Sequence, residues 1–373
     1  MANGKDRNAN LELLRILSMV LIVFHHYSYH GGFDFQGVTA NKILADLLLF
    51  GGKLGVNIFI LITGYFTVHS SFKWRKLIRV WLAVVFWSVF GVLLGALLVK
   101  VWPTAAAALE MELSLGLLLK SFLPISFNAY WFATDYLVLY LISPFLSWFV
   151  KNAGEKQSKR LVLILLVIWC IIPTFLVNRE GWAYSDLGWF ILMYLTGAHL
   201  SLYGKKYIQK SAKCILLGSL TVAVVWTIAV LADVSGMKFS SVLRFSTYFM
   251  NMTSVFMYFG SVFLFLGFAG MEISRTFQRA VNLIASGAFG VYLFHENEYV
   301  RPFLWQVIFR NSEYAQSSVL LFLGHAVCAV MLVYIAGTAL ELLRQYVVEK
   351  PVMKLVDKVS DYAKSKGSFW QTE

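Results

Sequence analysis

Apolar residues occur along this chain in runs of about twenty residues, and short polar segments separate the runs. An α-helix of that length spans the hydrocarbon core of a bilayer. The pattern therefore predicts an all-α fold, a polytopic membrane bundle of about ten transmembrane helices. The predicted helices cover residues 11–29, 44–68, 77–100, 130–150, 160–178, 187–203, 213–233, 247–270, 280–300 and 317–343.

One apolar segment differs from the others. Residues 109–123 are short, and their first residues are acidic, so they predict an amphipathic helix at the membrane interface. We expect a single transmembrane domain over residues 1–345. Residues 346–373 contain too few apolar side chains to build a core, so we expect them to form a cytoplasmic tail.

The basic residues predict the orientation of the bundle. The chain has 32 Lys and Arg against 20 Asp and Glu, a formal net charge of +12. With both termini in the cytoplasm, the cytoplasmic segments hold more than twice as many basic residues as the outer segments. This asymmetry is typical of membrane proteins. Topology therefore explains the positive charge better than binding to nucleic acid, and we expect no nucleic-acid partner.

The composition excludes several other classes of protein. Hydrophobic residues make up 59% of the chain and charged residues 14%, whereas a soluble domain has about 25% charged residues. We expect no cleaved signal peptide, because no cleavage site follows the first apolar run. Cys170, Cys214 and Cys328 have no paired spacing, and the chain lacks metal-ligand motifs, so we expect neither disulfides nor a metal site.

Two polar residues in the first apolar run, Arg15 and His26, are the first candidates for chemistry. Their spacing of about three helical turns places both on one face, about 16 Å apart along the axis. Charged and titratable groups are costly at membrane depth, which makes this stripe a candidate site. Glu12 should pair with Arg15 at a spacing of three. His25 points about 100° away and is the weaker candidate.

A neutral imidazole at His26 would suit a general base acting on a hydroxyl group. In the alternative interpretation, Arg15 reaches to the membrane interface and His26 only bonds a neighbouring helix.

The segment between the second and third runs is basic. Arg75, Lys76 and Arg79 lie in it, and such a cluster can hold a phosphate-bearing ligand through charge-assisted hydrogen bonds. Membrane topology and contact with lipid headgroups explain the same charges, so this alternative stays open.

Polar residues in three other runs complete the candidates. Asn57 lies at depth and needs a hydrogen-bond partner. Trp131 fits an interfacial aromatic belt, whereas Asp135 would orient a base or a substrate. Tyr292 and His295 share a face near the outer end of their helix. They would suit a site for a hydroxyl acceptor, or they bond neighbouring helices.

Together these residues resemble the motifs of the acyltransferase-3 family of integral membrane O-acyltransferases. Arg15, ten intervening residues and His26 resemble the pattern in that family's first span, and Glu12 stands where the family usually has an acid. The resemblance covers essentially the whole chain. The further matching elements are residues 55–59, 64–66, 72–76 and 292–295, together with Trp131, Tyr136, Tyr140, Ser143 and Pro144. The chain departs from the family pattern at three positions. Thr63 stands in place of a serine, Lys76 in place of an arginine and Glu296 in place of a proline.

The resemblance implies transfer of an acyl group, usually acetyl from acetyl-CoA, to a hydroxyl of a carbohydrate or cell-envelope polysaccharide. It also implies a bacterial plasma membrane, and any extracytoplasmic partner protein would act in trans. His26 would be the base or a transient acyl acceptor. The residues that we assign on this basis are Glu12, Arg15, His26, Tyr292 and His295 for catalysis, Arg75, Lys76 and Arg79 for the donor, and Asn57, Trp131 and Asp135 for the acceptor.

Two other functions fit the same pattern less well. Buried Arg and His also line transport paths, so a transporter or flippase of a polar lipid-linked sugar is one alternative. The chain shows no clear internal repeat, which argues weakly against it. The departures at Lys76 and Glu296 leave a non-catalytic sensor relative as the other alternative.

Overall fold

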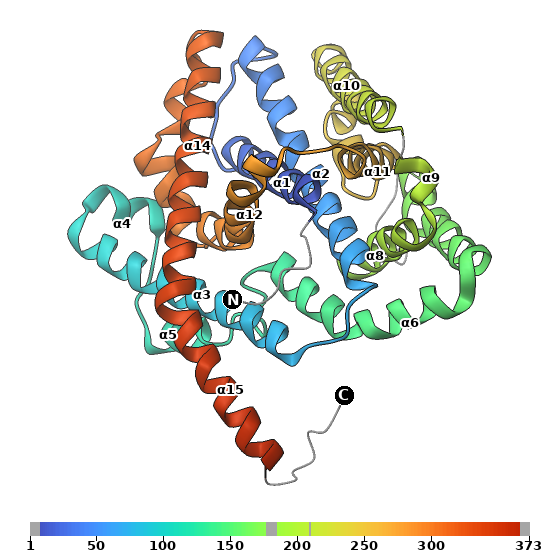
Figure 1. The fold of residues 1–373 in the computed structure, drawn as a ribbon. Coiled ribbons are helices and arrows are strands. Elements are labelled where there is room, and N and C mark those ends of the chain that lie inside the picture. Colours follow the sequence, from blue (N-terminus) through green and yellow to red (C-terminus); the bar gives the residue numbers. More distant parts are fainter. Residues whose placement is uncertain (1–7, 177–184, 209, 366–373) are drawn as a thin grey trace.

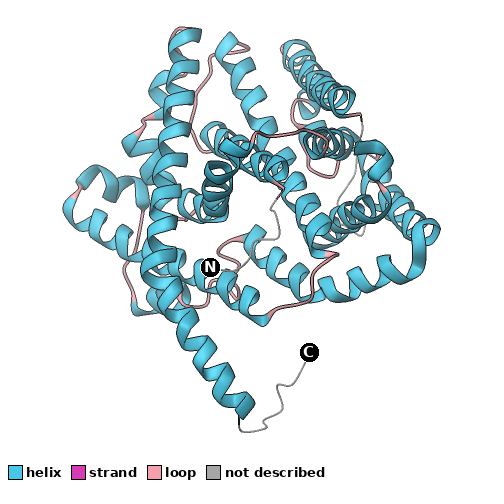
Figure 2. Ribbon diagram, in the orientation of Figure 1, coloured by secondary structure: helices cyan, strands magenta, loops and turns pink. Residues whose placement is uncertain are grey.

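The computed structural model describes residues 8–176, 185–208 and 210–365, and the regular structure within these ranges is helical, without strands (Figures 1 and 2). This confirms the all-α prediction. The long helices are α1 (Ala9–Tyr29), α2 (Ala40–Thr67), α3 (Trp74–Val101), α6 (Trp131–Leu166), α8 (Asp186–Tyr203), α10 (Ser211–Gly236), α11 (Val255–Ala269), α12 (Arg275–His295), α14 (Val319–Arg344) and α15 (Lys350–Ser365). The short helices are α4 (Pro103–Leu109), α5 (Leu115–Ser121), α7 (Ile172–Phe175), α9 (Lys205–Ile208) and α13 (Val300–Pro302).

Within the described residues, seven helical segments are long and apolar enough to cross a membrane. They are Ala9–Tyr29, Ala40–Thr67, Trp74–Val101, Trp131–Phe175, Ser211–Gly236, Ser240–Ala269 and Val319–Tyr362. The predicted spans 130–150 and 160–178 fall largely in one of these segments, and residues 177 and 178 lie outside the described ranges. The predicted spans 187–203 and 280–300 correspond to α8 and α12, which are not among the seven. The count of ten and the orientation of the termini stay predictions.

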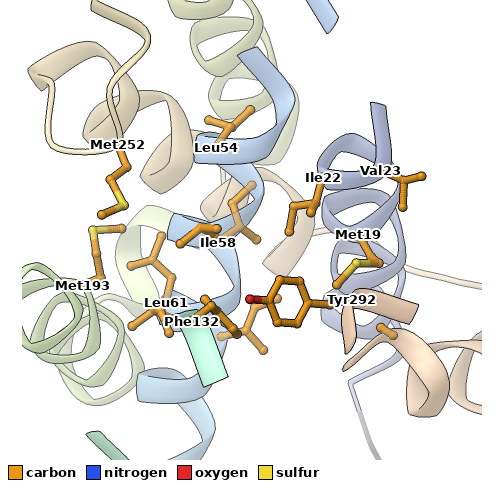
Figure 3. Close-up of a cluster of buried hydrophobic side chains, with 14 of the residues drawn as sticks. Met19, Ile22, Val23, Leu54, Ile58, Leu61, Phe132, Met193, Met252 and Tyr292 are labelled. Atoms are coloured by element: carbon orange, nitrogen blue, oxygen red, sulfur yellow. The ribbon is translucent and has the colours of Figure 1, made fainter. Parts of the chain in front are cut away.

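Helix α2 packs closely against α1 and α8 because two of its glycines leave no side chain between the backbones. A Cβ atom on Gly55 would lie 2.6 Å from the carbonyl oxygen of Ser18 in α1. One on Gly64 would overlap the carbonyl oxygen of Tyr194 in α8. These two glycines therefore permit the close approach of the helices. Figure 3 shows the apolar side chains of α1, α2, α8 and α12 that fill this part of the core.

Two connecting segments differ from the prediction. The chain changes direction within α6 at Gly154, whose φ of 76° is a conformation that glycine adopts without steric cost. The single interfacial helix expected over residues 109–123 is not formed. Helix α4 ends at Leu109, Glu110 has a left-handed φ of 45°, and α5 occupies only Leu115–Ser121.

Helix α14 continues through a π-helical turn into α15, so the expected tail is helical as far as Ser365 (Figure 1). Two ion pairs join this extension to the start of α3. Arg79 lies 2.9 Å from Glu349, and Arg75 lies 2.8 Å from Asp357. These contacts place residues 349–357 beside the first turns of α3.

Candidate active site

A small cavity of about 50 Å³ lies beside the C-terminal half of α1. We call it the small cavity. The side chains with polar atoms in its lining are His25 and His26 of α1, Lys53 of α2, Trp131 of α6 and Tyr292 of α12, and apolar residues complete its wall. The fold thus brings three predicted site residues together from three helices that are far apart in the sequence.

The side chain of His26 forms a hydrogen bond with His295, and the bonding partners identify its tautomer. His26 Nδ1 lies 2.8 Å from His295 Nε2, and His295 Nδ1 lies 2.5 Å from the carbonyl oxygen of Val291. A carbonyl oxygen only accepts, so His295 Nδ1 carries a proton and the Nε2 atom of the neutral ring is an acceptor. His26 therefore donates from Nδ1 and keeps a lone pair on Nε2. This is the tautomer that a general base requires.

A carboxylate lies next to this histidine pair. Glu296 Oε2 is 3.3 Å from His26 Nδ1 and 3.5 Å from His30 Nε2. Its other oxygen, Oε1, accepts a hydrogen bond from Arg301 at 2.9 Å. The carboxylate would therefore stabilise a positive charge that forms on His26 during proton transfer.

The position of Glu296 depends on where α12 ends. The sequence predicts a helix over residues 280–300, but α12 ends at His295. The side chain of Asn297 accepts hydrogen bonds from two of the next backbone N–H groups and donates to the carbonyl oxygen of Trp87 in α3. These bonds replace helical ones, so the chain turns and Glu296 comes to lie beside the end of α1.

A second, larger cavity of about 660 Å³ lies beside the N-terminal half of α1. We call it the large cavity. Its cationic lining residues are Arg15, Lys76, Arg79 and Arg344, and its carboxylates are Glu12, Glu341 and Glu349. Two of the three predicted donor residues therefore face the same space as Arg15.

Ion pairs between residues three apart hold two of these arginines in the wall. Arg15 Nη1 lies 2.7 Å from Glu12, which confirms the predicted pair. Arg344 lies 2.7 Å from both Glu341 and Glu349 and is only 3% exposed. Within the described part of the chain, Arg15 uses only Nη1 for its pair, so its other donors can meet a ligand.

The two cavities adjoin. Phe59 of α2, Phe132 of α6 and Phe289 of α12 line both of them, and we call this set the aromatic partition. Figure 3 shows the ring of Tyr292 directed from α12 toward Phe132. A long, thin ligand that passed the partition would touch the arginine side and the histidine side at once.

Four of the predicted residues are absent from both linings: Arg75, Asp135, Asn57 and His295, the last of which bonds His26. Arg75 is half exposed and pairs with Asp357 of α15. Asp135, one helical turn after Trp131, is also absent from both linings.

Asn57 lies outside the two linings as well, because its polar atoms serve the packing of the helices. It accepts a hydrogen bond from the indole of Trp189 in α8 at 2.7 Å and donates to the carbonyl oxygen of Met252 at 2.9 Å. The partner that the sequence required for this buried amide is therefore structural.

Sequence reasoning missed several residues of these cavities. Lys53 is a lysine within an apolar run, which is itself a signal. Glu341 and Arg344 repeat the spacing of the first ion pair at the end of another run. The sequence does not distinguish the three phenylalanines of the aromatic partition from the others, because the chain has 31 Phe in all. The approach of His30 and Glu296 to His26 depends on the fold alone.

One family of known proteins matches most of the chain. The model of an acyltransferase domain matches residues 8–340. Searches of curated proteins and of solved structures gave no match. The family match and the seven apolar helical segments together identify this chain as a multi-pass membrane protein.

Proposed function

The chain belongs to the acyltransferase-3 family, and on that premise we propose that it transfers an acyl group from acyl-CoA to a hydroxyl of a carbohydrate acceptor. One observation carries this proposal: two cavities adjoin, one with Arg15, Lys76 and Arg79 in its wall and the other with His26. The phosphates of the donor would lie in the large cavity, and its acyl group in the small one.

The large cavity has the charge and size for a nucleotide-bearing donor. Arg15, Lys76 and Arg79 offer charge-assisted hydrogen bonds to phosphate oxygens. The volume of about 660 Å³ lies within the usual range of ligand pockets, roughly 300–1,000 Å³. The thiol arm of CoA would cross the aromatic partition and cover the distance from Arg15 to His26, about 16 Å along α1.

His26 would act on the acceptor hydroxyl through Nε2. This atom accepts the hydroxyl proton while the hydroxyl oxygen bonds to the thioester carbonyl carbon. The carbon–sulfur bond then breaks, and the CoA thiolate takes the proton back from His26. A route in which Nε2 carries the acyl group transiently uses the same geometry. Glu296 and His295 support either route, because they hold the ring and balance its charge.

Lys53 would stabilise the negative charge on the carbonyl oxygen. Its Nζ lies 5.7 Å from the centre of the Trp131 ring, and it lines the small cavity with His26. A cation placed where charge develops in the transition state accelerates the reaction without tightening ground-state binding.

The size of the small cavity favours acetyl as the acyl group. Holding one water-sized group takes roughly 10–15 Å³ of such volume. The volume of about 50 Å³ therefore suits the three heavy atoms of an acetyl group. A longer chain would meet the side chains of Ile22, Val56 and Tyr292.

The acceptor would approach from the C-terminal end of α1, where Trp131 and Lys53 lie. The distribution of basic residues predicts that this end faces away from the cytoplasm. We therefore propose a cell-envelope polysaccharide as acceptor and a bacterial plasma membrane as location. A partner protein acting in trans would carry the modified unit further.

Labelled acetyl-CoA tests this function. Membranes that contain the protein are incubated with labelled acetyl-CoA and the surface polysaccharide of the host, next to His26→Ala membranes at matched expression. Label in an alkali-labile ester, in the wild type alone, is the expected result. Equal labelling of both would remove His26 from the mechanism. Movement of a lipid-linked sugar without ester formation would support the transporter alternative.

A further inference from the structure

Three potential metal ligands, His26, His295 and Glu296, meet where α1 and α12 end, and His30 lies beside one of them. The ligand atoms of His26, His295 and Glu296 lie within 4.8 Å of one another, and His30 Nε2 lies 3.5 Å from the same carboxylate oxygen. We propose that His26, His295 and Glu296 form a binding site for a divalent transition-metal ion such as Zn²⁺, with three protein ligands and an open fourth position. Imidazole and carboxylate groups are common ligands of this ion.

The distances of Glu296 Oε2 to its two imidazole neighbours are those of ligands that share a metal ion. Zn²⁺ bonds to nitrogen and oxygen at about 2.0–2.2 Å, so neighbouring ligand atoms lie about 3.3 Å apart. Glu296 Oε2 lies 3.3 Å from His26 and 3.5 Å from His30. Both contacts are longer than a typical charge-assisted hydrogen bond of about 2.8 Å. The 2.8 Å contact between His26 and His295 must open by about half an ångström.

Groups around the cluster already hold the ligands as metal sites require. The Nδ1 proton of His295 is donated to the carbonyl oxygen of Val291, which turns the lone pair of Nε2 into the cluster. Arg301 bonds the second oxygen of Glu296. A backbone carbonyl or a charged partner behind each ligand is the usual outer shell of a bound metal.

An ion can reach this cluster, because His295 alone among these four side chains is fully buried. The side chains of His30 and Glu296 are 18% and 14% exposed, and that of His26 is 14% exposed. The Glu296 carboxylate contributes one negative charge, which Arg301 balances from its other oxygen.

Metal binding would switch off the proposed acyl transfer, a consequence that rests on the proposed function. Coordination by Nδ1 of His26 moves the proton of the neutral ring to Nε2. Nε2 then has no lone pair to accept the proton of the acceptor hydroxyl. The binding of the ion itself depends only on the geometry of its ligands.

Cobalt titration tests the site without any knowledge of the acyl acceptor. The full chain is purified in detergent with an affinity tag free of histidine, washed with a chelator and titrated with Co²⁺, followed by visible absorption. We expect one tetrahedral Co²⁺ per chain, displaced by Zn²⁺. Glu296→Gln and His295→Asn should each raise the dissociation constant for Co²⁺ at least about tenfold. His69→Asn is the control, because His69 bonds Ser201 far from the cluster.

A saturable spectrum that the Glu296 and His295 variants lose, while their thermal unfolding in detergent stays as in the wild type, would support the site. Absence of saturable binding would overturn it, as would binding that both variants retain. A protein that binds Co²⁺ but transfers no acyl group even in its metal-free form would keep the metal site and contradict the proposed function. Zn²⁺ inhibition of acetyl transfer that Glu296→Gln relieves would support both.

Discussion

His26 and His295 are 269 positions apart in the chain, yet their rings form one hydrogen-bonded unit with 2.8 Å between Nδ1 and Nε2. The carbonyl oxygen of Val291 sets the proton on His295, and His295 in turn sets the proton on His26. The order of these bonds leaves Nε2 of His26 as the free base of the site.

Loss of this base should abolish acetyl transfer. We expect His26→Gln to lower kcat by about 10²–10⁴-fold, the usual contribution of a general base. His295→Phe removes only the acceptor that orients His26, so its kcat should fall by about tenfold or more, but less than in His26→Gln. Transfer of labelled acetyl in proteoliposomes measures both. His199→Asn is the control, because His199 bonds Ser158 away from the cavities. Full activity in His26→Gln would refute the assignment.

Arg79 and Arg75 provide a matched pair for the donor site. Arg79 lines the large cavity, whereas Arg75 lies outside it and pairs with Asp357. A hydrogen bond to a charged group contributes about 1.5–3 kcal/mol. Arg79→Ala should therefore raise the KM for acetyl-CoA about 10–100-fold. Arg75→Ala should change it by less than about threefold, because exposed ion pairs contribute little. Equal effects of the two variants would place the phosphates elsewhere.

Lys53→Met tests the stabilisation of the carbonyl oxygen. If Lys53 acts on the transition state, kcat should fall by about 10²–10³-fold while the KM for acetyl-CoA stays nearly constant. Lys53→Arg keeps the charge and should retain more of the activity. Steady-state kinetics with saturating acceptor separates the two constants. A rise in KM at unchanged kcat would instead make Lys53 a binding residue.

Ile22→Ala should widen the acyl preference. Ile22 lines the small cavity, and the space left by its side chain would accept a longer chain. One methylene in an apolar pocket changes specificity by about 10–200-fold, so the kcat/KM ratio of butyryl-CoA to acetyl-CoA should rise at least about tenfold. Ile58→Ala is the control, since Ile58 is fully buried but outside the lining. An unchanged ratio in Ile22→Ala would show that this wall does not set chain length.

Arg344→Met should destabilise the fold. Arg344 is buried and pairs with Glu341 and Glu349, so its removal leaves two carboxylates without their shared cation. Breaking a buried pair costs about 3–5 kcal/mol. Arg310→Met is the matched control, because its pair with Glu313 is exposed and should contribute about 0–1 kcal/mol. Thermal unfolding in detergent compares the two. Similar unfolding temperatures would mean that water already screens the Arg344 pair.

Much of the helix pattern could be predicted, because the apolar runs are local features. The stripe of Glu12, Arg15 and His26 follows from helical periodicity alone, and the structure places these residues along the two adjoining cavities. The end of α12 could not be predicted, since Asn297 stops the helix through a bond to Trp87 in another helix.

The sequence by itself determined that this is an all-helical membrane protein of the acyltransferase-3 family with an arginine–histidine stripe. The apolar runs and the stripe depend on residues that are close together in the chain. Only the tertiary structure decided which distant groups join that stripe. It brought His295 and Glu296 to His26, took Arg79 into the large cavity while Arg75 stayed outside, and set three phenylalanines between the two ends. The physical reason is that helix packing and the position of each helix end fix such contacts, and neither is encoded in local spacing.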